Sequence, residues 1–169
     1  MPNVSTACIQ TRRVIQATCG QECIDWAISL LEAGHDSHYL RLLIGMSPPF
    51  NHFEVANYRD GLLDALGVNS IDPETCVSNY CAELMQSVLN KERDVFETVK
   101  EIAGLCLQCG YQHDIFCFYS LWCAYEDLQV SEMQWYWEEA TLENIESIIL
   151  AEMNRYVESR NNGSGERPA

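Results

Sequence analysis

The chain has 169 residues, of which 47% are hydrophobic, and this is enough apolar material for a folded domain with a core of its own. Its 25 acidic and 10 basic residues give a formal net charge of −15, which argues against nucleic acids and anionic membranes as direct partners because their phosphates would be repelled. The same charge would accelerate association with a basic protein, and charge that serves only solubility is the alternative interpretation.

The first residues, MPNVSTACIQTRR, contain no positively charged segment followed by an apolar run, so we predict no signal peptide. The longest apolar run, Ile115 to Tyr125, is too short for a bilayer, which requires roughly 20 residues. Nine cysteines without an export signal are expected to be reduced and mostly packed in the core. Together these features predict a cytoplasmic protein.

The first half of the chain predicts three helices with recognisable ends. The segment CIDWAISLLEAG has apolar residues at the spacing of one helical face, and Gly34 follows where a C-terminal cap belongs. A helix over 37–46 is expected to end before two prolines. A third helix, over 51–67, begins with Asn51 and Glu54 at the spacing of a capping box and ends at a glycine.

The second half predicts a further series of helices. Asp72 and Pro73, followed by an acid in the first turn, start a helix that we expect to reach about Leu89. Another helix is predicted over 93–108, and the apolar run from Ile115 predicts the next.

The last predicted helix is capped by Thr141. Its apolar residues form one stripe, made of Leu142, Ile145, Ile149, Met153 and Tyr156. The final residues, NNGSGERPA, are polar and glycine-rich, and we expect them to be disordered.

These patterns predict an all-α protein, a single-domain helical bundle of about seven or eight helices built from irregular helical hairpins. The domain is expected to span residues 1–159, with a disordered tail over 160–169. Three segments, each a helix end followed by a glycine and a polar turn, resemble stacked helical repeats. The unequal spacing of those glycines favours an irregular bundle over a strict repeat array.

A cysteine-rich segment in the second half contains the strongest metal-like pattern. Cys106 and Cys109 form a C-x2-C pair, with His113 and Cys117 nearby, and zinc sites often pair ligands in this way. The pair lies in an apolar helical pattern rather than on a turn, and Cys123 falls on a different helical face from Cys117. A metal site or a small enzyme in this segment is therefore an alternative hypothesis. The main hypothesis includes no cofactor and no catalytic residue.

The segment MQWYWEEATLENIE, residues 133–146, combines neighbouring aromatic rings with carboxylates. Glu139, Glu143 and Glu146 would form a row on one face of the last helix if that helix began slightly before Thr141. Between residues 126 and 152 there are eight acids and no Lys or Arg, so the segment forgoes the paired contacts of a mixed surface. The rings are either anchors of a partner-binding surface or part of the bundle core.

Three phrases, SLLEAGHDS, LRLLIGMSPPFNHFEVANYRDGLLDALGV and QWYWEEATLENIESII, together resemble a group of small all-helical bacterial proteins, mostly uncharacterised. Members of this group are similar in size and acidity to the immunity proteins of toxin systems. The similarity covers most of residues 24–155, and the PPFN motif followed by Phe53 and Glu54 is characteristic but carries no known chemistry. The resemblance implies a bacterial cytoplasmic protein that acts by binding.

We therefore hypothesise a non-enzymatic, acidic protein-binding module of the immunity or antitoxin type, which neutralises a basic partner protein. The predicted partner-binding residues are the two tryptophans and four carboxylates of the segment, namely Trp135, Trp137, Glu138, Glu139, Glu143 and Glu146. The alternatives are a metal-binding protein or enzyme that uses Cys106, Cys109, His113 and Cys117, and an oligomeric scaffold whose rings bury against a second copy of the chain.

Overall fold

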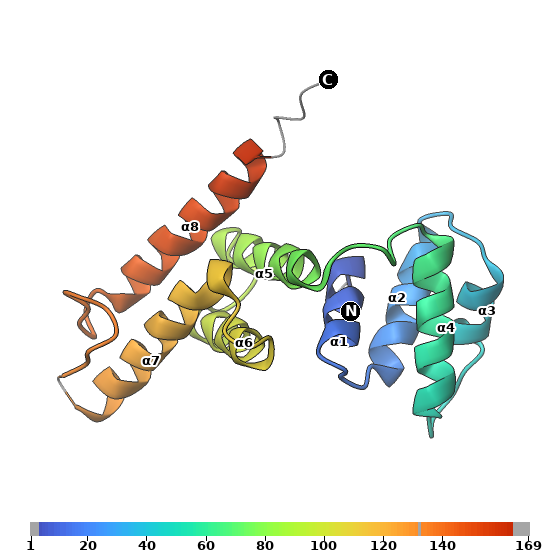
Figure 1. Cartoon of the computed structure of the whole chain (residues 1–169), viewed down its shortest axis with the longest axis horizontal. Coiled ribbons are helices and arrows are strands. Elements are labelled where there is room, and N and C mark those ends of the chain that lie inside the picture. The colour runs from blue at the N-terminus through green and yellow to red at the C-terminus, as the bar shows by residue number, and fades with distance from the viewer. Residues whose placement is uncertain (1–3, 132, 164–169) are drawn as a thin grey trace. The chain divides into compact units, whose positions relative to one another are not determined.

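The structure is a computed structural model that describes residues 4–131 and 133–163 (Figure 1). These residues form eight α-helices and one short 3-10 helix, and none of them lies in a β-strand, so the predicted all-α class is confirmed. Among the helices described, none has both the length and the apolar character that a membrane crossing requires. In chain order the helices are α1 (Thr6–Val14), α2 (Gly20–Glu32), α3 (His38–Ile44), α4 (His52–Ala65), α5 (Pro73–Leu89), α6 (Val95–Gln108), η1 (His113–Ile115), α7 (Phe116–Val130) and α8 (Ile145–Gly163).

The helices divide into two compact units, Met1–Tyr80 and Cys81–Ala169, and the boundary between the units falls inside α5. Buried α5 side chains lie on both sides of that boundary, among them Val77 and Leu84. The single domain predicted over residues 1–159 stays a prediction.

In the N-terminal unit, α2 contacts α1, α3 and α4, and α3 contacts α4. Their shared core contains Trp26, which is 1% exposed and whose indole Nε1 donates a hydrogen bond to Thr6 Oγ1 over 3.1 Å. Burial of each large apolar side chain stabilises such a core by about 1.5–3 kcal/mol. The other large buried side chains of this core are Ile9, Leu40, Leu43, Leu62 and Leu63.

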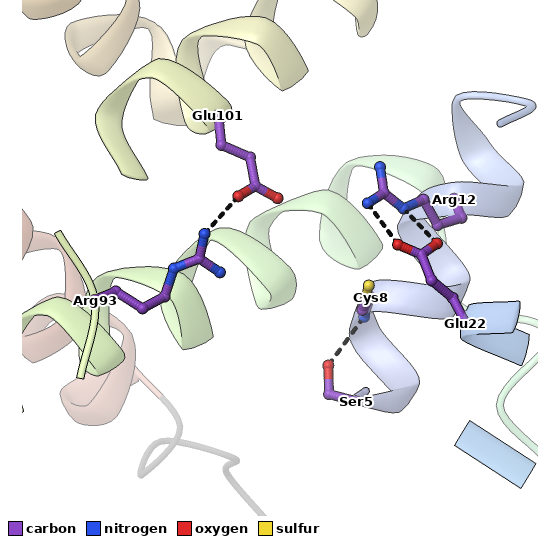
Figure 2. A network of polar contacts seen from close by, with 6 residues as sticks. All are labelled: Ser5, Cys8, Arg12, Glu22, Arg93 and Glu101. Atoms are coloured by element: carbon purple, nitrogen blue, oxygen red, sulfur yellow. Dashed lines mark hydrogen bonds and ion pairs between the residues drawn. The ribbon is translucent and has the colours of Figure 1, made fainter. Parts of the chain in front are cut away.

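Helix α1 was not among the predicted helices, and polar contacts to distant residues hold it in place. Gln10 Nε2 donates to the Val68 carbonyl over 2.8 Å, and Thr11 Oγ1 donates to the Cys76 carbonyl over 3.2 Å. Arg12 donates through Nε and Nη2 to both carboxylate oxygens of Glu22 over 3.1 and 3.0 Å, which joins α1 to α2 (Figure 2). The local sequence of α1 contains no sign of these partners.

In the C-terminal unit, α6 packs along α7, and α8 contacts both of them (Figure 1). All three helices contribute fully buried side chains, namely Ile102, Phe118, Leu121, Ile145 and Ile149. Before α6, Arg93 Nη2 donates to Glu101 Oε2 over 2.8 Å (Figure 2).

Three helices of the described chain end at the glycines that the sequence marked as caps. Gly34, Gly67 and Gly110 follow α2, α4 and α6 with φ angles of 89°, 71° and 70°. In each case the next N–H returns to a carbonyl five positions back, as in the 3.1 Å bond from the Val68 N–H to the Leu63 carbonyl. This is the Schellman motif, which satisfies carbonyls that the helix leaves without partners. The predicted glycine caps are confirmed.

The same motif follows α1 and α5 without a glycine. Gln16 and Lys91 occupy the left-handed position with φ angles of 54° and 63°. The Ala17 N–H then bonds to the Arg12 carbonyl over 2.9 Å, and the Glu92 N–H bonds to the Ser87 carbonyl over 2.8 Å. A side chain at this φ costs roughly 1–2 kcal/mol, so surrounding contacts must offset the strain at both positions.

The last helix differs from its prediction at both ends. It begins at Ile145 rather than just after Thr141, and Leu142, placed on the buried stripe by its spacing, is 52% exposed. It continues to Gly163, so residues 160–163 of the predicted disordered tail are helical. The rest of that tail, residues 164–169, lies outside the described residues.

The helix ends lead to a paired prediction. Gly67→Ala is expected to lower the free energy of unfolding by about 1 kcal/mol, because a Cβ at positive φ is strained even though it would meet no atom within 4 Å. Gly104 in the interior of α6 has equally open space but helical backbone, so Gly104→Ala is expected to raise the free energy of unfolding by roughly 0.5–1 kcal/mol. Urea denaturation followed by circular dichroism measures both, and effects of the same sign would contradict this account.

A second prediction concerns the two units. Since α5 runs without interruption through the boundary, we expect both units to unfold together. Trp26 is the only tryptophan before residue 81, so a variant that retains Trp26 alone and a variant that retains Trp122 alone report on different units. In each variant, the urea midpoint read by fluorescence is expected to coincide with that variant's own circular dichroism transition, although the loss of the buried Trp26 lowers both midpoints in the second variant. Separate midpoints within one variant would show that the units unfold independently.

Candidate partner-binding surface

The predicted binding segment forms an irregular connection between α7 and α8. Its centre is the side chain of Gln134, whose Oε1 accepts hydrogen bonds from the backbone N–H groups of Tyr136 and Trp137, both over 2.8 Å. The same side chain donates through Nε2 to the carbonyl of Trp137 and, over 3.4 Å, to that of Ala140. One side-chain amide therefore provides hydrogen bonds to backbone groups that in a helix or strand would bond to other backbone groups.

Asn144 organises the second half of the connection. Its Oδ1 accepts from the Thr141 N–H over 2.7 Å, and its Nδ2 donates to the Glu139 carbonyl over 2.9 Å. Glu139 adopts a φ of 64°, which turns the chain at that point. Asn144 is the residue immediately before α8, so the prediction that Thr141 caps this helix is wrong. Thr141 contributes its carbonyl instead, which accepts from the Ile145 N–H over 2.9 Å.

The turn around Gln134 sends the two tryptophan rings to different surroundings. Trp135 is 88% exposed and Tyr136 is 51% exposed, whereas Trp137 is half-buried. The buried side chain of Ala140 lies beyond them, ahead of the fully buried Ile145. Of the two predicted anchors, Trp135 is thus presented to solvent and Trp137 is partly packed against the protein.

The four predicted carboxylates are all exposed, but Glu139, Glu143 and Glu146 do not form the predicted helical row. Glu138 and Glu139 lie in the turn and Glu143 lies before α8, because the helix starts only at Ile145. Among these four, only Glu146 is helical, and it lies in the first turn, where the helix dipole favours a negative charge. None of the four forms an ion pair with a residue that the structure describes.

Glu146 differs from the other three carboxylates in its neighbours. It lines a surface cavity of about 440 Å³ together with Lys91, Arg93 and Asp94. Two cations nearby reduce the negative potential at this end of the segment. The acidic field is therefore strongest where Glu138, Glu139 and Glu143 stand close to the exposed Trp135 in the sequence.

The cysteine segment does not bring together a set of ligands. Cys106 is buried in α6, and burial raises its pKa to about 11; burial likewise raises the pKa of the half-buried Cys117 to about 11. His113 is exposed and Cys109 is half-buried. Within residues 4–131 and 133–163, no three His, Cys, Asp or Glu side chains gather as a metal ion requires. The geometry thus gives the metal alternative no support.

All nine cysteines are free thiols, and six of them are buried. The expectation that most of them pack as core residues is confirmed.

Comparisons with protein-family models, with curated proteins and with solved structures found no match for this chain. The predicted resemblance to immunity-type proteins therefore stays a prediction.

The role of Gln134 leads to a prediction about backbone dynamics. Gln134→Ala removes four hydrogen bonds, so amide exchange at Tyr136 and Trp137 is expected to accelerate by about tenfold or more. Hydrogen–deuterium exchange with mass spectrometry measures this change. The matched control is Gln86→Ala, which removes an amide that bonds only to the side chain of Asn90 on the surface of α5. Unchanged exchange over 135–140 in the Gln134 variant would contradict the role assigned to this side chain.

Proposed function

We propose that this chain is an acidic protein-binding module and that the connection between α7 and α8 contains its binding surface. The observation that carries the proposal is the exposed ring of Trp135, held by the turn around Gln134. A tryptophan that is 88% exposed contributes little to the core, and tryptophan is the residue type most enriched at the centres of protein interfaces.

The charge around Trp135 favours a basic partner. Glu138, Glu139 and Glu143 are exposed and have no cationic partner among the described residues, so their field extends into solvent. Such a field accelerates the encounter with a positively charged protein and slows the encounter with an acidic one. The ring would then supply the short-range contact and the carboxylates the long-range attraction.

The most concrete form of this proposal is a module of the immunity or antitoxin type, which neutralises a basic protein by covering it. Binding rather than catalysis is proposed because the carboxylates of the segment are exposed to water, whereas general acids and bases usually act from a site that excludes it. Nine free thiols favour a reducing compartment, so the proposed place of action is the cytoplasm.

The test begins with capture of partners on the immobilised full-length chain. A partner that follows the proposal is basic, is retained by the wild type and is lost with Trp135→Ala. The matched control is Phe53→Ala, which removes a ring that is 90% exposed in the N-terminal unit and is expected to retain the partner. If Trp135→Ala captures the same proteins as the wild type, the proposed role of Trp135 as an anchor is contradicted.

Association kinetics with the captured partner then test the charge. Glu139→Lys combined with Glu143→Lys is expected to slow association about tenfold at low salt and to flatten its salt dependence. The control double variant, Glu32→Lys with Glu92→Lys, makes the same net change at other exposed acids and is expected to have a smaller effect. An unchanged association rate in the first variant would contradict the proposal. Light scattering that shows a dimer lost with Trp135→Ala would favour the scaffold alternative.

A further inference from the structure

The N-terminal unit contains a cavity of about 280 Å³ whose lining is cationic, in contrast to the acidity of the chain. Arg13, His52 and Arg59 line it, and among the described residues that surround it none has a carboxylate side chain. Cys19 also lines the cavity and is the residue immediately before α2. Its sulfur makes no capping hydrogen bond to that helix, so it is available to other partners.

Arg59 is the cation that forms a hydrogen bond with Cys19. Its side chain is only 9% exposed, and its Nη1 donates to Cys19 Sγ over 3.8 Å. Its Nε donates to Asp60 Oδ1 over 2.8 Å, which fixes the direction of the guanidinium. A buried cation and the N-terminus of a helix both stabilise a thiolate.

Cys23 lies one helical turn beyond Cys19 and is fully buried. Its backbone N–H bonds to the Cys19 carbonyl over 2.8 Å, which places both side chains on the same side of the first turn of α2. The neighbouring Cys23 thiol and, despite burial, the charge of Arg59 lower the pKa of Cys19 to about 7. The neighbouring Cys19 thiol in turn raises the pKa of Cys23. Glu22 opposes the ionisation of Cys19, but its carboxylate is paired with Arg12.

This pair differs from six of the seven other thiols of the chain. Burial is the main cause of a raised pKa at each of Cys76, Cys81, Cys106, Cys109, Cys117 and Cys123. None of these six lines the cationic cavity. The cationic cavity thus separates one candidate nucleophile from six thiols whose pKa is raised by burial.

We propose that Cys19 and Cys23 form a reversible thiol–disulfide couple that a hydroperoxide, such as hydrogen peroxide, oxidises through this cavity. Cys19 is the nucleophile, Cys23 is the resolving thiol, and Arg59 is the positioning residue that stabilises the Cys19 thiolate.

The reaction has two steps. In the first, the Cys19 thiolate attacks one peroxide oxygen, the O–O bond breaks, and hydroxide leaves and takes a proton from solvent, so that Cys19 becomes a sulfenic acid and the peroxide is reduced to water. In the second, the Cys23 sulfur attacks the Cys19 sulfur, the S–S bond forms, and the S–O bond breaks. The hydroxide released from Cys19 takes up the thiol proton of Cys23 and forms a second water. An external dithiol reverses the oxidation by thiol–disulfide exchange.

Closing the disulfide requires movement only in the first turn of α2. Residues four apart on a helix have Cβ atoms about 5–6 Å apart, and a disulfide requires about 3.5–4.5 Å. Cys19 lies outside the helix, with φ of −136° and ψ of 41°, so its backbone can rotate without breaking the turns that follow. The oxidised form is therefore expected to have a loosened start of α2.

The sequence provides a direct test on the full chain. Trypsin is expected to release residues 14–41 as one peptide, and this peptide contains Cys19 and Cys23 and no other cysteine. After treatment of the native protein with hydrogen peroxide and blocking of the remaining thiols, the peptide is expected to lose two hydrogen atoms and to take up no blocking reagent. Reduction with dithiothreitol before blocking is expected to restore both thiols. A peptide 14–41 that stays reduced while other cysteines oxidise would overturn the proposal.

Variants then separate the roles of the residues. In Cys23→Ser, Cys19 is expected to stop at the sulfenic acid, which dimedone traps in the same peptide, and absence of that adduct would overturn the proposal. In the wild type, alkylation of Cys19 by iodoacetamide is expected to be half-maximal near pH 7 and at least about tenfold faster there than alkylation of Cys106. Equal rates at the two thiols would likewise overturn it.

Arg59→Gln is expected to shift the pH profile of Cys19 alkylation to higher pH and to slow its oxidation, and Arg59→Lys is expected to restore part of both. The matched control is Arg155→Gln, which removes an exposed cation of α8 and is expected to change neither. Circular dichroism checks that each variant is folded. If Arg59→Gln is folded and retains the wild-type pH profile, the role assigned to Arg59 is overturned.

Discussion

The last carbonyls of an α-helix have no partners within the helix, and five of the described helices meet this constraint with a left-handed residue at the helix end, which after α6 is followed by a second one, Tyr111. The motif reverses the chain within two residues, so the direction of each following segment depends on the backbone at the helix end. Where that residue is Gln16 or Lys91 rather than glycine, the backbone is strained. Four described non-glycine residues have a positive φ, and two of them line a cavity: Gln16 belongs to the wall of the Cys19 cavity and Lys91 to the cavity beside Glu146. Strain of this kind persists only where neighbouring contacts impose it, and it accumulates at sites of function more than elsewhere.

The ends of α2, α4 and α6 could be predicted because glycine is a local signal for the left-handed position. No residue type marks Gln16 or Lys91, and α1 was missed because its contacts from Gln10 and Thr11 reach residues more than fifty positions away. The composition of the candidate surface was predictable, but the direction of Trp135 was not. It depends on hydrogen bonds from the side chain of Gln134, and the start of α8 depends on Asn144 in the same way. Capping propensity predicted the cap at Thr141, three residues too early. Propensity does not indicate which of two nearby polar side chains forms the local hydrogen bonds.

The net charge of this chain describes its electrostatic potential only at long range. The value of −15 governs association with other macromolecules, and the acidic segment around Trp135 follows the same sign. The lining of the Cys19 cavity has the opposite sign, because Arg13 and Arg59 converge there although basic residues are scarce in the chain. A local constellation of this kind decides the chemistry of a thiol, whereas the global field decides which molecules approach the protein. The two proposals therefore rest on different scales of the same electrostatics, and each can hold without the other.

An exposed aromatic ring is most useful for binding when its backbone is already ordered. Ordering a side chain at an interface costs about 0.5–1.5 kcal/mol, and ordering a loop adds to that cost. In this connection, Gln134 and Asn144 together satisfy backbone groups of residues 136–141, which directly follow Trp135, so the backbone there is ordered without burial of the ring. Burying the rings would have stabilised the segment by a simpler route, through apolar area removed from water. That the segment is stabilised by polar side chains while Trp135 stays in solvent supports a role for the ring outside the core, and the half-buried Trp137 beside it ties the turn to the protein.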